Sequence, residues 1–168
     1  MGPVLPLPAP RWPYHSRSGF SIVEIALVVL ILSLIAAVAA PRYLEARNHF
    51  DAEAAAARVA ADLYHARQHA KTKGTTQRVD FTPVSHTYTL TGMKDIDRPT
   101  QPFTVDLTTL SSPATIVSVS FGAGGTGTSL DFDMYGRPDY GGNVVIASGG
   151  EQRTIVVNAQ TGKISIQP

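Results

Sequence analysis

The sequence of 168 residues contains no cysteine and almost no excess charge. The absence of cysteine excludes a disulfide framework, a thiolate metal site and a cysteine nucleophile. The formal net charge of +1 is too small for a strongly basic nucleic-acid-binding protein or for an acidic tail protein. Taken alone, this length and a hydrophobic fraction of 43% fit one ordinary globular domain.

Charged side chains are missing altogether from one long stretch. Residues 25–40 carry no charge, and Ser33 is their only polar residue. As a helix, residues 20–40 would rise roughly 31 Å, which matches the hydrocarbon core of a bilayer at about 30 Å. We therefore predict a transmembrane helix over residues 20–41, interrupted by a single acid, Glu24, close to its start.

The residues before this span have a different composition. Residues 1–19 contain five of the twelve prolines and two arginines, Arg11 and Arg17, with no acid. Proline fixes φ and removes a backbone donor, so neither helix nor sheet is expected at this density. We predict that residues 1–19 form a leader peptide.

A second helical pattern follows the apolar span. Over residues 42–74 the small and apolar side chains recur at steps of three, one and four, which indicates one face of an amphipathic helix. Most of the charged residues, Asp62 and Arg67 among them, are expected off that face, and Gly74 provides a helix stop. The predicted apolar stripe consists of Ala52, Ala55, Ala56, Val59, Leu63, Ala66 and Ala70.

From residue 75 onward the period changes to two, and turn signals separate eight short segments. The sequence thus predicts an α+β fold: a long N-terminal α-helix, whose first half spans a membrane, packed on a C-terminal antiparallel β-sheet domain at residues 75–168. The predicted strands are residues 77–81, 87–90, 103–107, 115–121, 129–133, 143–147, 153–157 and 163–166.

Glu24 decides how the apolar span is interpreted. A secretory signal peptide with a cleavage site near residues 37–39 and a plain membrane anchor are both alternatives. Neither explains an acid whose burial at a membrane centre costs about 2.5–3.5 kcal/mol, although less near an interface. If the chain is cut between Gly19 and Phe20, Glu24 becomes the fifth residue. It could then pair with the new α-amino group of a stacked neighbour and set the register between subunits.

Residues 18–25, Ser-Gly-Phe-Ser-Ile-Val-Glu-Ile, resemble the class III signal of type IV pilins and type II secretion pseudopilins. The resemblance implies cleavage by a prepilin peptidase after Gly19 and N-methylation of Phe20. It also implies an assembly role for Glu24 and a helix kink at Pro41, the twenty-second residue of the mature chain. The leader departs from the family pattern, because family leaders are usually short and basic.

Residues 63–70 and the closing strands of residues 130–164 are similar to the GspH/FimT family of minor pilins and pseudopilins. This resemblance implies a structural subunit of a type IV pilus or a type II secretion pseudopilus, with no enzymatic activity and no cofactor. The implied partners are the prepilin peptidase, other pilin or pseudopilin subunits, the inner-membrane assembly platform and the membrane. The subunit would be a single-pass protein of the bacterial inner membrane with a periplasmic C-terminal domain, and later part of a filament.

Two alternative functions stay open. One is a soluble periplasmic β-sheet binding protein exported by a signal peptide, and the other is a minor pilin with a direct role in DNA uptake. A DNA-binding surface needs clustered bases, whereas those of the β domain are scattered among acids, so nucleic acid is not an expected partner. These bases are Arg78, Lys94, Arg98, Arg137, Arg153 and Lys163.

Two further motifs have the spacing of a ligand site. Residues 122–127 have the spacing G-x-G-x-x-G after a predicted strand, but a dinucleotide site needs a helix next, and we expect a hairpin loop. His65 and His69 have a metal-chelating spacing without the glutamate of H-E-x-x-H. We assign both histidines to the surface or to helix–sheet packing.

Asp131, Asp133 and Asp139 lie near Gly136 and could suggest a calcium site. The EF-hand pattern is absent, so we expect solvated strand and turn residues.

No arrangement typical of a catalytic nucleophile is present either, and the sequence predicts neither catalytic nor metal-binding residues.

Overall fold

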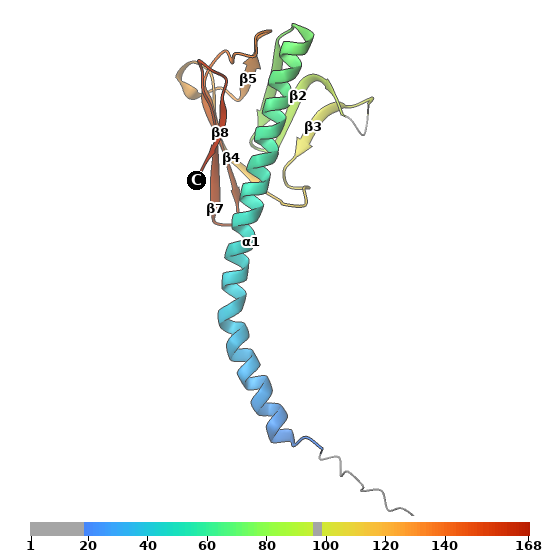
Figure 1. Ribbon diagram of the computed structural model, residues 1–168, viewed down its shortest axis with the longest axis vertical. Helices are drawn as coiled ribbons and strands as arrows, with labels where there is room; N and C mark the ends of the chain where they lie inside the picture. The colour runs from blue at the N-terminus through green and yellow to red at the C-terminus, as the bar shows by residue number, and fades with distance from the viewer. Residues whose placement is uncertain (1–18, 96–98) are drawn as a thin grey trace, which may run out of the picture. The chain divides into compact units, whose positions relative to one another are not determined.

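The computed structural model in Figure 1 describes residues 19–95 and 99–168. The chain divides after Ala39 into two compact units, residues 1–39 and 40–168. The predicted leader lies outside the described residues, apart from Gly19.

A single helix, α1 (Ile22–Lys73), contributes to both units. Ser21 caps its start: the hydroxyl Oγ accepts a hydrogen bond from the Val23 backbone N at 3.3 Å. The helix ends at Gly74, whose φ of +64° is the left-handed conformation that glycine adopts most readily. Pro41 lies inside the helix.

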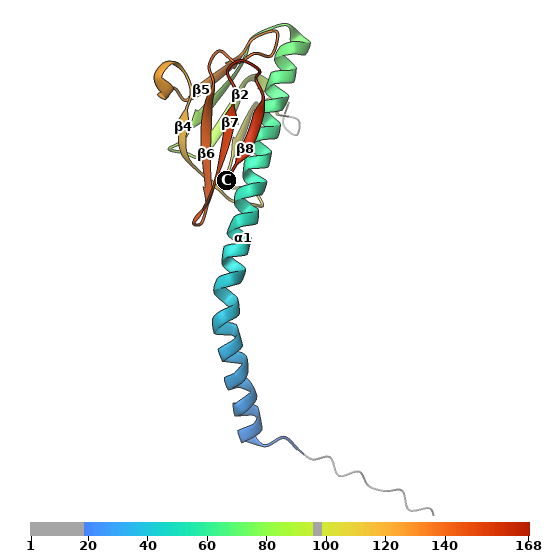
Figure 2. The same ribbon diagram turned by 60° about the vertical axis from the view of Figure 1, so that its left-hand side comes forward.

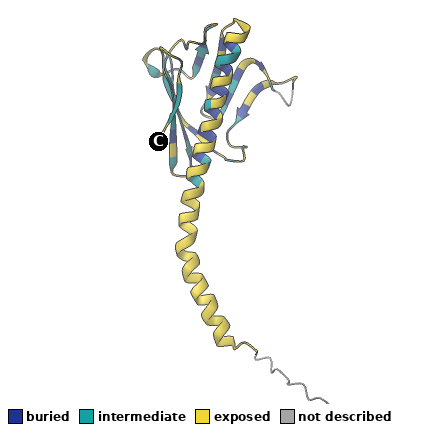
Figure 3. Ribbon diagram, viewed as in Figure 1, coloured by how far each residue is buried: buried dark blue, intermediate teal, exposed yellow. Residues whose placement is uncertain are grey.

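The predicted apolar stripe is the buried face of α1. All seven of its residues, from Ala52 to Ala70, are buried in the C-terminal unit, as the dark blue turns in Figure 3 indicate. One charged residue, Asp62, is buried as well, contrary to its expected place off the stripe. The reason is a tertiary contact, because a strand supplies a hydrogen-bond donor to the Asp62 carboxylate.

The strands form two antiparallel sheets of four strands each. Sheet 1 has the order β3-β2-β1-β5 and sheet 2 the order β4-β6-β7-β8 (Figures 1 and 2). A helix packed on antiparallel sheets confirms the predicted α+β fold, and all eight predicted strands are present with ends that differ by a few residues. Their bounds are β1 (Gln77–Thr82), β2 (Thr87–Lys94), β3 (Pro102–Asp106), β4 (Thr115–Ser120), β5 (Ser129–Phe132), β6 (Gly142–Ser148), β7 (Glu151–Val157) and β8 (Ile164–Gln167).

One hydrophobic core joins α1 to both sheets. Buried side chains alternate along the strands, as in β7, where Arg153, Ile155 and Val157 are buried. The alanines of the helical stripe let the helix approach the sheets closely, and the large side chains of the strands fill the remaining space. The largest fully buried side chains include Tyr88, Phe121, Phe132, Leu63, Leu90 and Leu107.

The glycine-rich loop at residues 122–127 connects β4 of sheet 2 to β5 of sheet 1. Phe121 and Gly127 pair in an antiparallel bridge that closes the loop, with a short turn of 3-10 helix, η1 (Ala123–Gly125), at its tip. The loop therefore has hairpin geometry, as predicted, although it joins strands of different sheets. Strand β5 follows it where a dinucleotide site would need a helix.

Candidate assembly site

The residues of the predicted cleavage and assembly site lie at the start of α1. Gly19 and Phe20 precede the helix, and the Phe20 side chain is 78% exposed. Glu24 lies in the first helical turn. A carboxylate there is stabilised by about 0.3–1 kcal/mol through the helix dipole, and the Glu24 carboxylate makes no hydrogen bond or ion pair with any residue that the structure describes.

The N-terminal unit exposes a large apolar surface, and contact of such a surface with water is energetically unfavourable. Every residue from 22 to 39 is exposed, and Glu24 is the only charged one. Within the described residues, α1 is the one helix long and apolar enough to cross a membrane, by length and composition. Apolar patches of this extent mark contacts with lipid or with other protein surfaces, so the helix needs one of these environments.

In the C-terminal unit, Asp62 and Tyr88 connect α1 to β2 inside the core. The Tyr88 hydroxyl donates to Asp62 Oδ2 at 2.5 Å, and Arg58 Nε donates to the same oxygen at 3.0 Å. Burial, followed by the neighbouring Asp62 carboxylate, raises the pKa of the Tyr88 hydroxyl. The Asp62 charge likewise raises the pKa of Arg58. The Asp62 carboxylate is thus buried and held by two donors.

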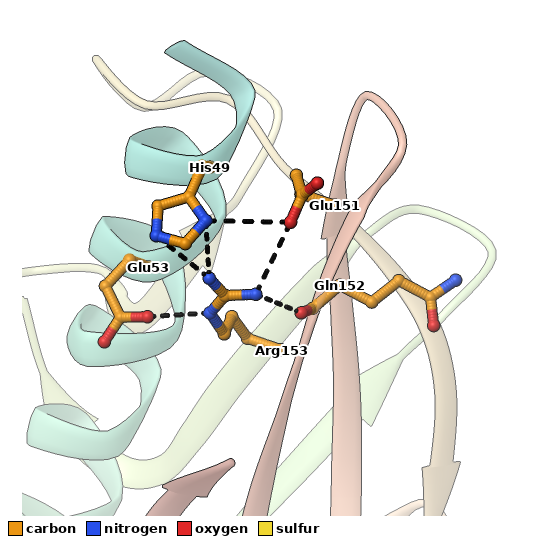
Figure 4. Close-up of polar contacts among 5 residues, drawn as sticks. All are labelled: His49, Glu53, Glu151, Gln152 and Arg153. Carbon is orange, nitrogen blue, oxygen red and sulfur yellow. Dashed lines mark hydrogen bonds and ion pairs between the residues drawn. The ribbon is translucent and has the colours of Figure 1, made fainter. Parts of the chain in front are cut away.

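A second polar contact lies around Arg153 of β7, whose side chain is almost completely buried (Figure 4). Its Nε donates to Glu53 of α1 at 2.7 Å, and its Nη1 donates to the Gln152 carbonyl oxygen at 2.7 Å. The Nη2 group approaches the His49 ring at 2.9 Å, and Glu151 lies 3.7 Å from both Nη1 and His49 Nδ1. This cluster attaches sheet 2 to α1.

Near the opposite end of the helical stripe, Arg67 bonds to two turns of the β domain. Its Nε donates to the Gly136 carbonyl oxygen and its Nη2 to the Thr161 carbonyl oxygen, both at 2.9 Å. Arg67 therefore fixes the β5–β6 and β7–β8 connections to the helix. The sequence pattern gave no sign of the roles of Arg67, Arg153 and Asp62, because the partners that join them to other elements lie 26 to 104 residues away along the chain.

The three aspartates considered for calcium all have protein partners. Asp131 lies opposite Arg78 in the β1–β5 pair and accepts two hydrogen bonds from its guanidinium, at 2.8 and 2.6 Å. Asp133 accepts from the backbone N of Arg137 at 2.7 Å, and Asp139 accepts from the backbone N of Asp131 at 3.1 Å. Among residues 19–95 and 99–168, no group of three or more His, Asp or Glu residues could hold a metal ion.

Residues 55–161, more than half of the chain, match the family model described as "Type II transport protein GspH". The chain belongs to the GspH family. No curated protein matches the sequence. The matched region runs from Ala55 of α1 into the β7–β8 connection, so it includes the strands β1 to β7 and the part of the helix that packs on them.

Solved structures of a minor pilin and of a minor pseudopilin share the fold. The type IV minor pilin FimU of Pseudomonas aeruginosa is 17% identical, with a TM-score of 0.51 over 70% of this chain and 88% of FimU. The minor pseudopilin EpsH from the Type 2 Secretion System of Vibrio cholerae is 15% identical, with a TM-score of 0.50 over 70% of this chain and 96% of EpsH. Family and fold are those of structural subunits: the chain is a GspH/FimT-like minor pilin or pseudopilin subunit.

Proposed function

We propose that this GspH-family subunit is cleaved by a prepilin peptidase after Gly19, methylated on the new N-terminal Phe20, and transferred from the inner membrane into a pilus or pseudopilus. The observation that carries the proposal is the position of Glu24. Its carboxylate lies in the first turn of a helix whose next charged residue is Arg42. Cleavage after Gly19 would put a cationic amine four residues before it.

The energetic argument concerns the two charges that cleavage would leave in an apolar environment. An isolated carboxylate in lipid is costly, and the helix dipole offsets only about 0.3–1 kcal/mol of that cost. A neighbouring subunit, displaced along the filament axis, could present its Phe20 amine to Glu24. The pair satisfies both charges and fixes the axial register, which is a well-attested use of buried polar pairs.

The apolar surface of residues 22–39 supports the membrane stage and the filament stage alike. In the bilayer it contacts lipid, and in the filament it contacts the equivalent helices of other subunits. Because lipid tails and neighbouring helices are both apolar, the transfer changes the apolar burial little. The β domain lies on the periplasmic side, and the inner-membrane assembly platform acts on the membrane-anchored subunit. The protein catalyses no reaction in this account.

Substitution of Glu24 tests the register role. Glu24→Val should insert into the membrane and lose its leader normally, yet remain in the membrane fraction when filaments are sheared from cells. The matched control is Glu45→Ala, which removes an exposed acid outside the apolar segment and should enter filaments at the wild-type level. Wild-type incorporation of Glu24→Val would refute the register role.

Substitution of Gly19 tests the cleavage step separately. Gly19→Val should block processing, so that the chain keeps its leader and accumulates in the membrane. Normal processing of this variant at a site near residues 37–39 would instead identify an exported soluble protein with a signal peptide. That result would remove the membrane-anchored subunit altogether.

A further inference from the structure

A cationic groove lies between the last turns of α1 and the end of β2. Its volume is about 590 Å³, and its walls carry four basic side chains. His65, His69 and Lys73 come from the helix, and Lys94 comes from the strand. Met93, which is almost completely buried, also contributes to the lining. Lys73 and Lys94 are 21 residues apart in the sequence, so only the fold brings them together.

Three of these basic groups are free of internal partners. The side chains of His65, Lys73 and Lys94 make no hydrogen bond or ion pair within residues 19–95 and 99–168. By contrast, Arg78 and Arg153 each bond to a carboxylate. The fold has therefore placed two permanent positive charges beside one groove without neutralising them.

The fourth basic group is held in place by a buried polar residue. His69 Nδ1 donates to Gln77 Oε1 at 3.0 Å, and Gln77 is buried. The Gln77 amide in turn donates to the carbonyl oxygens of Thr91 at 2.6 Å and Arg78 at 3.0 Å. These bonds join the helix to β1 and β2 at the groove, so the walls are positioned before any ligand arrives. Such pre-organisation lowers the entropic cost of binding.

The lining determines the chemical class of the ligand. It contains no Asp or Glu among the described residues, so a metal cation would meet the lysines without a compensating carboxylate. The two lysines favour an anion. Single-stranded nucleic acid is usually held by aromatic stacking and by many phosphate contacts, but the lining has no Phe, Tyr or Trp and only two permanent charges.

We propose that this groove binds an acidic segment of a partner polypeptide, whose carboxylates lie against Lys73 and Lys94. The open volume accommodates several residues of such a segment, and Met93 supplies an apolar contact for its side-chain methylene groups. Two positive charges match a segment with two or more neighbouring Asp or Glu residues. The proposal concerns the C-terminal unit alone and does not depend on the cleavage or register steps proposed above.

The test uses the full chain in detergent and a fluorescein-labelled hexaglutamate peptide, with binding followed by fluorescence anisotropy at about 0.15 M salt, where charges more than about 8 Å apart are largely screened. Lys73→Ala/Lys94→Ala should weaken the peptide by about tenfold or more, equivalent to about 1.4 kcal/mol. The matched control is Lys71→Ala/Lys163→Ala, which removes the same charge. Lys71 lies beside Gly136, and neither residue lines the groove. The control should change the affinity by less than about twofold. Equal thermal midpoints of the two variants establish that both are folded.

Three results would overturn the proposal. The first is no measurable binding of hexaglutamate to the wild-type chain. The second is an equal loss of affinity in the groove and control variants, which would indicate attraction to net charge alone. The third is tighter binding of a labelled oligothymidylate than of the peptide, with the same dependence on Lys73 and Lys94, which would assign the groove to nucleic acid instead.

Discussion

The buried hydroxyl of Tyr88 gives the sharpest stability prediction. Tyr88 is 1% exposed, and its hydroxyl donates to the buried Asp62 carboxylate. Tyr88→Phe keeps the ring and removes this donor, so Asp62 retains only Arg58 Nε at 3.0 Å. Because a hydrogen bond to a charged group contributes about 1.5–3 kcal/mol, the variant should lose about that much of the free energy of unfolding.

The same contact predicts a dependence on alkaline pH. Burial and Asp62 raise the pKa of the Tyr88 hydroxyl in the folded protein. The folded state therefore favours the neutral phenol over the phenolate. The contribution of the protonated Tyr88 hydroxyl to the free energy of unfolding is complete below the ordinary tyrosine pKa of about 10. This contribution is lost as the pH rises above that value. Above that value, the free energy of unfolding should fall by up to about 1.4 kcal/mol per pH unit because of this group. Tyr88→Phe should lack that contribution.

Urea unfolding of the full chain in detergent, followed by far-ultraviolet circular dichroism from pH 7 to 11, measures both effects. The matched control is Tyr64→Phe, because Tyr64 lies on α1, is 53% exposed and has a hydroxyl that makes no hydrogen bond among the described residues. The control should cost less than about 0.5 kcal/mol and keep the alkaline slope. If Tyr88→Phe costs no more than Tyr64→Phe, or shows the same slope as wild type, the account of this contact is wrong.

Two paired substitutions test the packing of the C-terminal unit by the same unfolding assay. Ala66→Leu should lower the free energy of unfolding by about 1–3 kcal/mol, because Ala66 is completely buried where α1 meets the sheets. Ala57 is exposed, so the control Ala57→Leu should be within about 0.5 kcal/mol of wild type. Equal effects of the two substitutions would contradict the close helix–sheet packing. Gly142→Ala should cost at least about 1 kcal/mol, because a Cβ there would overlap the Ser120 carbonyl oxygen. Gly150→Ala, with open space around it, should be neutral or more stable by up to about 1 kcal/mol, and a loss at Gly150 as large as at Gly142 would refute the steric argument.

Local periodicity predicted the elements of this fold well. The helical stripe from Ala52 to Ala70 is the buried face of α1, because apolar side chains repeated every three to four residues have one common environment. The strands were equally readable, because alternate residues face the core. Periodicity carries no information about pairing, however. The division into two sheets, with the connection from β4 to β5 crossing between them, depends on contacts between distant segments.

The polar residues show the limit of sequence reasoning more clearly. Aspartate is a residue type that usually faces solvent, but Asp62 is buried, because Tyr88 and Arg58 donate hydrogen bonds to its carboxylate. His65 and His69 were readable as a pair on one helical face. Their position beside Lys73 and Lys94 could not be predicted from the sequence, because it depends on the packing of the end of α1 against the end of β2. The meaning of a charge depends on its partner, which local sequence does not specify.

The most direct test of the central proposal is the N-terminus of the subunit recovered from purified filaments. Tandem mass spectrometry of that material should identify N-methylphenylalanine at Phe20, followed by Ser-Ile-Val-Glu, with no peptide from residues 1–19. A mature chain that begins near Ala40 or Pro41 would have lost Glu24 and the whole apolar segment. That result would contradict a membrane-anchored subunit that assembles through its N-terminal helix.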